Sequence, residues 1–342
     1  MAQNNQDIVI KHLDKTSIVE QIHVVYSNDI ELCLNDYLVK WESKQYKNPL
    51  GDSLVFGAYL DGKLVGMNAY MPMEYNYQGQ KVKLLQSCDS KVLEECRGKG
   101  IWGKIVTFAV DYIFSNTDYA CIIGFPNYSN SYPGFVKMKW QTIDHMKNYV
   151  MVNNDKALAK LFSNKSFLKR CLARLAGMQR LIINYFKSRG FSVEKCGFED
   201  LLWDDVEDKM CVEHTTKWLE WKRVYKSIKT LVIKYNGKSL GSCVYSVGKY
   251  EGREICIIEK FVTARITKRN KKKTLASLLY YLKQQEPNAA FVRTWTMGGE
   301  EFDSLCKSCL FIKSSHSNPF IIKQPSTVFN GRIWHLSFLD LD

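Results

Sequence analysis

The residues best suited to chemistry lie in one short glycine-rich segment, Cys96-Arg97-Gly98-Lys99-Gly100-Ile101-Trp102-Gly103-Lys104. It places three glycines within six residues and flanks them with basic side chains. Glycine allows the backbone to approach a ligand closely and to take positive φ, so that the first amides of a following helix can point at an anion. The helix dipole adds a modest attraction for negative charge. The segment therefore predicts an anion-binding turn between an extended segment, 83–93, and a helix, 105–115.

The segments around this turn alternate as in an α/β domain. Apolar residues at helical spacing, Leu34, Leu38 and Trp41, predict a helix over 30–44. Turn signals at Asp61-Gly62 and Gln78-Gly79 predict two hairpins. The strands expected for these hairpins are 53–60, 63–71, 73–77 and 81–92. After the helix at 105–115 we expect a strand at 119–124, a compact helix ending near Trp140 and a strand at 142–152.

The second half repeats this order of elements. A tryptophan-led segment, Trp221-Lys222-Arg223-Val224-Tyr225-Lys226, resembles the one that begins at Trp41, and Asn236-Gly237 repeats the hairpin turn. A strand at 255–263, a helix at 274–284 and a strand at 289–296 follow. In place of the glycine turn stands a glycine-free basic run, Lys268-Arg269-Asn270-Lys271-Lys272-Lys273. The second half is therefore interpreted as a copy without its own cofactor site, and the basic run as a solvated loop.

Between the halves lies a basic, amphipathic stretch. Apolar positions in 158–162 and 167–185 alternate with Arg170, Arg174 and Arg180, as in a helix that packs on the protein or lies on an anionic membrane surface. The sequence thus predicts three parts: a first domain at 1–152, a helical connector at 153–200 and a second domain at 201–342.

Composition limits the class of protein. A hydrophobic fraction of 46% and a charged fraction of 24% are those of a globular protein. No apolar run reaches 18 residues, and the N-terminus lacks the basic-then-apolar pattern of a secretory signal. The eleven cysteines do not have the regular spacing of a disulfide framework. We therefore expect a cytoplasmic protein with reduced thiols. The net charge of +13 favours anionic partners, such as a phosphorylated cofactor, a nucleotide-linked substrate, nucleic acid or an acidic membrane.

Two common phosphate motifs fit the turn by spacing alone. A P-loop would need Ser or Thr where Ile105 stands, to hold Mg²⁺. Gly98, Gly100 and Gly103 have the literal spacing of a dinucleotide fingerprint, but that motif needs a parallel βαβ unit, and here antiparallel hairpins come first. Both readings are therefore disfavoured.

The region resembles the GNAT acetyltransferase superfamily, whose signature is Gln/Arg-x-x-Gly-x-Gly/Ala after a central strand. Arg97 and Gly100 match it, while Trp102 replaces the final small residue. A subgroup with a bulky residue there also carries Gly-Phe-Pro-Asn, found here at Gly124-Phe125-Pro126-Asn127. The resemblance covers about residues 30–150. It implies an α/β (α+β) fold of two tandem GNAT-like domains, with mixed, mostly antiparallel sheets flanked by helices.

The resemblance also implies the cofactor, acetyl-coenzyme A, and no metal. Backbone amides from Arg97 to Gly103 would hold its pyrophosphate, with Arg97 and Lys99 adding charge. Val92 and Leu93, at the splayed end of the central strand, would bond the pantetheine arm and the thioester carbonyl. The residues expected to bind the cofactor are Val92, Leu93, Arg97, Gly98, Lys99, Gly100, Ile101, Trp102, Gly103 and Asn127.

For catalysis, acyl transfer needs a base for the acceptor and an acid for the leaving thiolate. The resemblance favours Asp89 as base, with Glu94 and Glu95 behind it. The usual thiolate-protonating tyrosine falls at Phe135, which cannot donate a proton, so Tyr132 is the candidate acid, with Tyr128 or water as alternatives.

Other candidate sites are weaker. Cys306 and Cys309 form a single pair without the further ligands that zinc needs, and Cys88 has no histidine within ten residues to activate it. The basic run at 265–273 lacks the interleaved aromatic residues typical of nucleic-acid binding.

The sequence thus predicts an acyltransferase that moves an acetyl or related acyl group from acetyl-coenzyme A to an amine of a small polar acceptor. The resemblance suggests an amino sugar of surface polysaccharide synthesis, so the acceptor is expected to be anionic or nucleotide-linked. Nucleic acid is not expected, and peripheral membrane contact through 167–187 is possible. The alternatives are an aminoacyl- or peptidoglycan-type transferase that uses charged tRNA and a non-catalytic acyl-coenzyme A-binding module.

Overall fold

The computed structural model describes residues 8–26, 34–154, 166–186, 190–203, 208–250, 252–297, 300–314, 317–325, 329 and 332–341. The chain divides into two compact units that are interleaved in sequence. Unit 1 comprises Met1–Asp144, Val212–Tyr225 and Asn318–Arg332, and unit 2 comprises His145–Cys211, Lys226–Ser317 and Ile333–Asp342. These units are not the continuous ranges 1–152 and 201–342, because two segments from the second half pack with the first.

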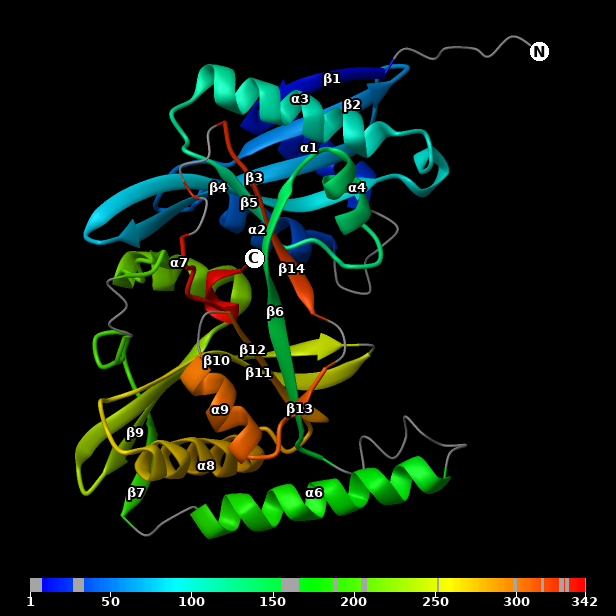
Figure 1. Cartoon of the computed structure of the whole chain (residues 1–342). Coiled ribbons are helices and arrows are strands. Elements are labelled where there is room, and N and C mark those ends of the chain that lie inside the picture. Colours follow the sequence, from blue (N-terminus) through cyan, green and yellow to red (C-terminus); the bar gives the residue numbers. More distant parts are fainter. Residues whose placement is uncertain are drawn as a thin grey trace. The chain divides into compact units, whose positions relative to one another are not determined.

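Unit 1 is built on a mixed sheet with the strand order β1-β2-β3-β4-β5-β14 (Figure 1). In this described part β4 pairs with β5 in parallel, and the other neighbouring strands pair antiparallel. The strands are β1 (Ile8–Leu13), β2 (Leu54–Leu60), β3 (Lys63–Tyr77), β4 (Gln80–Val92), β5 (Ile122–Gly124) and β14 (Asn318–Lys323). The helices are α1 (Lys15–Tyr26), α2 (Leu34–Tyr46), α3 (Ile101–Asn116), α4 (Tyr132–Lys137) and α7 (Thr216–Lys226, whose last residue belongs to unit 2), with a 3₁₀ turn, η1 (Glu94–Cys96).

The predicted hairpins are confirmed at their turns. Asp61-Gly62, Gln78-Gly79 and Asn236-Gly237 each supply two successive residues with positive φ, the second being glycine. Two left-handed residues make the tight turn whose twist matches that of the flanking strands.

The two strands predicted at 63–71 and 73–77 are one continuous strand, β3, which runs through Pro72. Proline lacks the N–H that a central strand needs. Here β2 ends at the Leu54–Tyr70 pair, and the carbonyl of Pro72 instead accepts a hydrogen bond from the Asn48 side chain at 2.8 Å. Pro72 lies beyond the last pair with β2, so no residue of β2 needs the N–H that proline lacks.

The core of unit 1 lies between the sheet and α3. One face of α3 is buried over its whole length, through Ile101, Ile105, Val106, Ala109, Val110 and Ile113. These side chains pack against strand residues such as Phe56, Val65, Leu85 and Ile122. Burial of this apolar face holds the first turn of α3 against the end of β4.

Unit 2 repeats the arrangement, with the strand order β6-β12-β11-β10-β9-β7, in which β11 pairs with β12 in parallel. Its strands are β6 (Gln141–Val152), which begins in unit 1, β7 (Phe191–Lys195), β8 (Cys211–Val212), whose last residue belongs to unit 1, β9 (Lys229–Tyr235), β10 (Lys238–Tyr250), β11 (Arg253–Thr263), β12 (Phe291–Met297), β13 (Ile312–Lys313) and β15 (Leu336–Ser337). Its helices are α6 (Ser166–Phe186), α8 (Lys268–Gln285), α9 (Glu300–Ser308) and the 3₁₀ turn η2 (Phe338–Asp340).

The predicted internal repeat is confirmed by this topology. The series β2-β3-β4-α3-β5 in unit 1 corresponds to β9-β10-β11-α8-β12 in unit 2 (Figure 1). One detail of the prediction is wrong, because residues 268–273 are not a loop but the beginning of α8. Thr267 caps this helix by accepting a hydrogen bond from the Asn270 amide at 3.4 Å. Within the described ranges no helix is long and apolar enough to cross a membrane.

Candidate functional site

The parallel strands β4 and β5 of unit 1 diverge at their ends. They pair at Leu85, Gln86 and Ser87, and β5 then ends at Gly124, while β4 continues to Val92. The last residues of β4 therefore face a gap in the ladder on that side. The pairing of the two strands thus ends before β4 does, and the splay that the resemblance implies for the central strand stays a prediction.

Val92 and Leu93 differ in what their backbone groups do. Leu93 donates its amide to the carbonyl of Val65 at 2.9 Å, and its own carbonyl accepts the amide of Cys96 at 3.0 Å. Alternate residues of a strand direct their backbone groups to opposite sides, so those of Val92 point away from β3, toward the side that β5 has left. The Val92 amide thus has the geometry expected for a backbone contact with a ligand, whereas both backbone groups of Leu93 are occupied.

A β-bulge interrupts β4 just before this end. Met67 pairs with Lys91 and Ala69 pairs with Cys88, so Asp89 and Ser90 together oppose the single residue Asn68. Asp89 has φ of 47°, which is unusual for a residue other than glycine. Asn68 is fully buried and stabilises the bulge by accepting a hydrogen bond from the Ser90 hydroxyl and donating one to Ser87 at 3.1 Å.

The Asp89 carboxylate is bound to helix α2. Its Oδ2 atom accepts hydrogen bonds from Lys44 Nζ at 2.9 Å and from Gln45 Nε2 at 2.6 Å, and the Tyr26 hydroxyl donates to the Asp89 carbonyl at 3.2 Å. Lys44 and Gln45 are both buried. These contacts give Asp89 a task that the sequence did not reveal, that of anchoring the bulge, and its role as a base stays a prediction.

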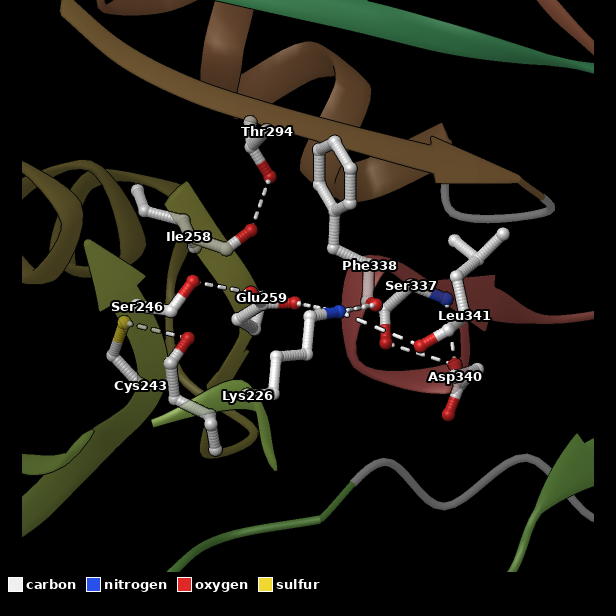
Figure 2. A network of polar contacts seen from close by, with 11 residues as sticks. Lys226, Cys243, Ser246, Ile258, Glu259, Thr294, Ser337, Phe338, Asp340 and Leu341 are labelled. Carbon is white, nitrogen blue, oxygen red and sulfur yellow. Dashed lines mark hydrogen bonds and ion pairs between the residues drawn. The ribbon is translucent and has the colours of Figure 1, made fainter. Parts of the chain in front are cut away.

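The corresponding strand of unit 2 carries the same device. The pairing of β10 with β11 shifts between Val244 and Tyr245, so that Glu259 is the extra residue. Figure 2 shows Glu259 between Ser246, which donates to it at 2.5 Å, and Lys226, whose Nζ lies 2.8 Å from it. In both units an acidic residue at a bulge of the central strand is thus paired with a lysine near the end of the preceding helix.

The glycine-rich segment has a shape suited to an anion. Gly98 and Gly100 have φ of 79° and 71°, and Gly100 is the N-cap of α3. A Cβ atom added at Gly98, Gly100 or Gly103 would meet nothing within 4 Å. The segment is therefore an open cradle that side chains at these three positions would fill.

Helix α3 begins earlier than predicted, at Ile101 rather than 105. Ile101, Trp102 and Gly103 consequently form its first turn, whose amides have no carbonyl partner within a helix. The Arg97 amide, by contrast, is bonded to the Glu94 carbonyl at 3.1 Å inside η1. The amide donors that fit an anion best are thus those of 101–103.

Positive charge surrounds this turn. Arg97, Lys99 and Lys104 are exposed, and Arg97 Nε lies 3.4 Å from the Val92 carbonyl oxygen, to which it donates. Burial lowers the pKa of Lys91, and the neighbouring charge of Arg97 lowers it further. A bound anion would relieve the repulsion between these cations.

The predicted residues downstream of β5 lie in one corner of unit 1. Tyr132 is the first residue of α4 and its hydroxyl lies 2.9 Å from Thr142 Oγ1. Asn127 is exposed, and its side-chain oxygen accepts hydrogen bonds from the Ser129 amide and hydroxyl, at 3.1 and 3.0 Å. The role of Tyr132 as an acid and the contact of Asn127 with the cofactor remain predictions.

Trp102 and Phe135 have structural explanations. The Trp102 and Phe135 rings meet edge to face at a centroid distance of 4.8 Å, and Phe135 also packs on Trp140. A Cβ atom at Gly134 would lie 2.4 Å from the Trp102 ring, so Gly134 makes room for the bulky residue at the last motif position. Phe135, where a tyrosine is usual, is only 4% exposed and belongs to the core.

The cysteine candidates are packing residues. Cys88 is buried and its Sγ accepts a long contact from Gln45 Nε2 at 3.8 Å. Cys306 and Cys309 are buried in the core of unit 2, where burial raises the pKa of Cys309 to about 11. Among the residues that the structure describes, no group of three or more His, Cys, Asp or Glu is placed to hold a metal ion.

Comparisons with known proteins agree with this geometry. Residues 31–143 match the family model described as an acetyltransferase (GNAT) domain. No curated protein sequence matches the chain.

Three solved structures illustrate the similarity of the fold. A GCN5-related N-acetyltransferase from Kribbella flavida is 10% identical, with a TM-score of 0.57, over 93% of this chain and 71% of its own. N-myristoyltransferase from Saccharomyces cerevisiae with bound myristoyl-CoA is 12% identical, with a TM-score of 0.57, over 94% of this chain and 83% of its own. A tandem GNAT protein from the clavulanic acid biosynthesis pathway is 11% identical, with a TM-score of 0.60, over 94% of this chain and 100% of its own.

The chain therefore has the fold of a tandem GNAT protein. The residues that match the acetyltransferase (GNAT) domain model, 31–143, include the open glycine turn and the paired residues of β4 and β5 described above.

Proposed function

We propose that the protein transfers an acyl group from coenzyme A to an amine, at the site formed by the end of β4 and the start of α3. The observation that carries the proposal is the open glycine turn at the N-terminus of α3, next to the point where β4 and β5 part. A Cβ atom at Gly98, Gly100 or Gly103 would occupy this space, so the glycines fit a ligand that approaches the backbone closely. Acetyl is the acyl group proposed.

In this proposal the chain's own residues bind and orient the thioester that coenzyme A supplies. The amides of Ile101, Trp102 and Gly103 donate to the pyrophosphate, and Arg97 and Lys99 add charge. The backbone amide of Val92 bonds the pantetheine arm on the side that β5 leaves free, while the Val92 carbonyl accepts from Arg97 Nε. The asymmetry between the units supports this assignment, because Thr267 caps α8 with its own side chain, whereas the N-cap of α3 is Gly100.

The proton transfers are proposed for Asp89 and Tyr132. Asp89 would accept the proton of the acceptor amine. Tyr132 would supply a proton to the departing thiolate. The hydroxyl of Thr142, 2.9 Å away, can hold its orientation.

The proposed acceptor is a small polar amine, and an amino sugar of surface polysaccharide synthesis is the first to test. The net charge of +13 supports an anionic or nucleotide-linked form. Turnover on a panel of free and nucleotide-linked amino sugars, followed by release of the coenzyme A thiol, tests this choice. Absence of turnover on every amine, with intact binding of acetyl-coenzyme A, would favour the non-catalytic binding module, and turnover that requires charged tRNA would favour the tRNA-dependent class.

Binding is tested by isothermal titration with acetyl-coenzyme A, comparing Gly100→Asp with Gly79→Asp. Both glycines have left-handed φ, 71° and 76°, and open space around the added side chain, and aspartate tolerates this conformation. A negative charge at position 100 would oppose the pyrophosphate, so we expect Gly100→Asp to weaken binding at least about tenfold and Gly79→Asp to leave it unchanged. Equal affinity of the two variants, or no binding by the unmodified protein at millimolar cofactor, would refute the proposed site.

A further inference from the structure

Helix α6 of unit 2 exposes an apolar stripe. Ala176, Gln179 and Ile183, on one side, are at most 4% exposed. Met178, Leu181 and Tyr185 are 54%, 71% and 81% exposed. Spacings of three and four residues put these three side chains on one face of the helix, opposite the buried one.

A basic pocket lies at the end of this helix. Its volume is about 630 Å³, and it is lined by Tyr185, Phe186, Lys268, Arg269, Lys272 and Lys273. The two aromatic residues end α6 and the four cations belong to the first two turns of α8. Lys272 Nζ lies 5.6 Å from the centre of the Phe186 ring, which ties the two helices together at the pocket.

The charges of these two helices have one sign. Helix α6 contains four Lys and Arg and helix α8 contains six, and neither contains Asp or Glu. One of the cations, Lys271, is paired with Glu301 of α9 at 2.6 Å. The lining residues include no carboxylate. The cations that line the pocket can therefore bind an anion that comes from outside the unit.

We propose that α6 and the first turns of α8 form a peripheral binding surface for an anionic phospholipid membrane. A helix lying in the interface places apolar side chains among the lipids and cations near the headgroups, which is the combination seen here. The pocket would receive a lipid phosphate, while Met178, Leu181 and Tyr185 enter the interface beside it. A soluble anion would leave this apolar stripe without a role, and charge complementarity favours an anionic bilayer over a neutral one.

The first test is flotation of the full-length protein with vesicles. We expect binding to phosphatidylcholine vesicles that contain about a third of phosphatidylglycerol, no binding to pure phosphatidylcholine, and release by high salt, because surface charge is screened. No flotation with the anionic vesicles would overturn the proposal.

Two variants test the two halves of the surface. Lys268→Glu with Arg269→Glu removes pocket cations, while the new acids at the helix N-terminus favour α8 and preserve the fold. Leu181→Gln with Tyr185→Gln removes the apolar stripe at exposed positions. Since each cation contributes about fivefold, we expect the first variant to lose at least twentyfold in vesicle binding, and the second to lose at least about tenfold.

The matched control is Lys238→Glu with Lys249→Glu, two exposed lysines of β10 that do not line the pocket. It changes the net charge equally and should bind vesicles much better than the pocket variant. Equal losses in the two would show that net charge alone drives binding and would overturn the site. Loss of RNA or free phosphate binding in the pocket variant, with no effect of the stripe variant on vesicles, would reassign the pocket to a soluble anion and also overturn it. The readout is vesicle binding, so it is independent of acyl transfer.

Discussion

At the scale of single residues, an acidic side chain holds each of the two bulges, and one of the two, Asp89, also has a proposed chemical role. Asp89 meets Lys44 and Gln45, and Glu259 meets Lys226 and Ser246, in each case from the extra residue of the central strand. A carboxylate that anchors a strand to a helix can also accept a proton, so structure and catalysis must be separated by experiment.

Substitutions in the Asp89–Lys44 pair can separate the structural role of Asp89 from its proposed catalytic role. Asp89→Asn leaves the Lys44 ammonium, whose side chain is 9% exposed, without its carboxylate, so we expect a loss of about 1–3 kcal/mol in the free energy of unfolding. Lys44→Met should destabilise the protein by a similar amount, and the double variant should recover part of the sum.

A catalytic role of Asp89 requires a loss of turnover in addition to a loss of stability. If Asp89 is the base, Asp89→Asn should lower kcat at least a hundredfold at a temperature where it is folded, with unchanged affinity for acetyl-coenzyme A, while Lys44→Met retains most of its turnover. Equal turnover losses in the two variants would leave Asp89 with the anchoring role alone.

At the scale of elements, the helices that follow the two central strands begin differently. Helix α3 starts with three glycines around its first turn, whereas α8 starts with Thr267 and a run of cations. The first offers backbone amides to a ligand, and the second offers side chains. The same element of the repeat has thus diverged into two kinds of basic surface.

Gly103 lies inside α3 with open space around its missing Cβ atom. Because alanine has the higher helix propensity, Gly103→Ala should raise the free energy of unfolding by about 0.5–1 kcal/mol, measured by urea denaturation. Gly100→Ala should instead lower it by about 1 kcal/mol, since its φ is 71°. A destabilised Gly103→Ala would show that the first turn of α3 is packed rather than open.

At the scale of the whole molecule, segments that are far apart in the sequence meet within unit 2, and residues 337–341 there contact Lys226 and its neighbours. Lys226 donates to the carbonyls of Phe338 and Leu341 at 2.9 and 3.4 Å while it pairs with Glu259, whose side chain is 0% exposed (Figure 2). Asp340 caps η2 by accepting hydrogen bonds from the Ser337 amide and hydroxyl, at 2.7 and 2.8 Å.

This network predicts a large effect of one substitution. Lys226→Met leaves the buried Glu259 carboxylate without its lysine and frees the C-terminal carbonyls, so we expect a loss of about 3–5 kcal/mol. Lys234→Met, which removes the exposed pair with Glu194, should cost less than about 1 kcal/mol. Thermal unfolding of both measures the contrast, and similar losses would contradict the role assigned to Lys226.

Short-range signals in the sequence determined the repeated units. Alternating apolar residues and Asp-Gly, Gln-Gly and Asn-Gly turns predicted the hairpins, and the glycine turn before α3 and the missing glycines before α8 predicted which unit has the cradle. These features depend on the local backbone, which neighbouring residues control. The first residues of α3 and α8 were less predictable. Gly103 has a low helix propensity, and the charged run 268–273 has no apolar residue that would mark a helix.

Only the tertiary structure decided what the individual side chains do. That Lys44 binds Asp89, that Val65 and Cys96 occupy the backbone of Leu93, and that Gly134 accommodates Trp102 are contacts between residues far apart in the chain. The interleaving of the units and the pocket between α6 and α8 are likewise long-range. A pattern of residue types records local preference, whereas burial and pairing depend on which distant segments meet, and that is set by packing of the whole fold.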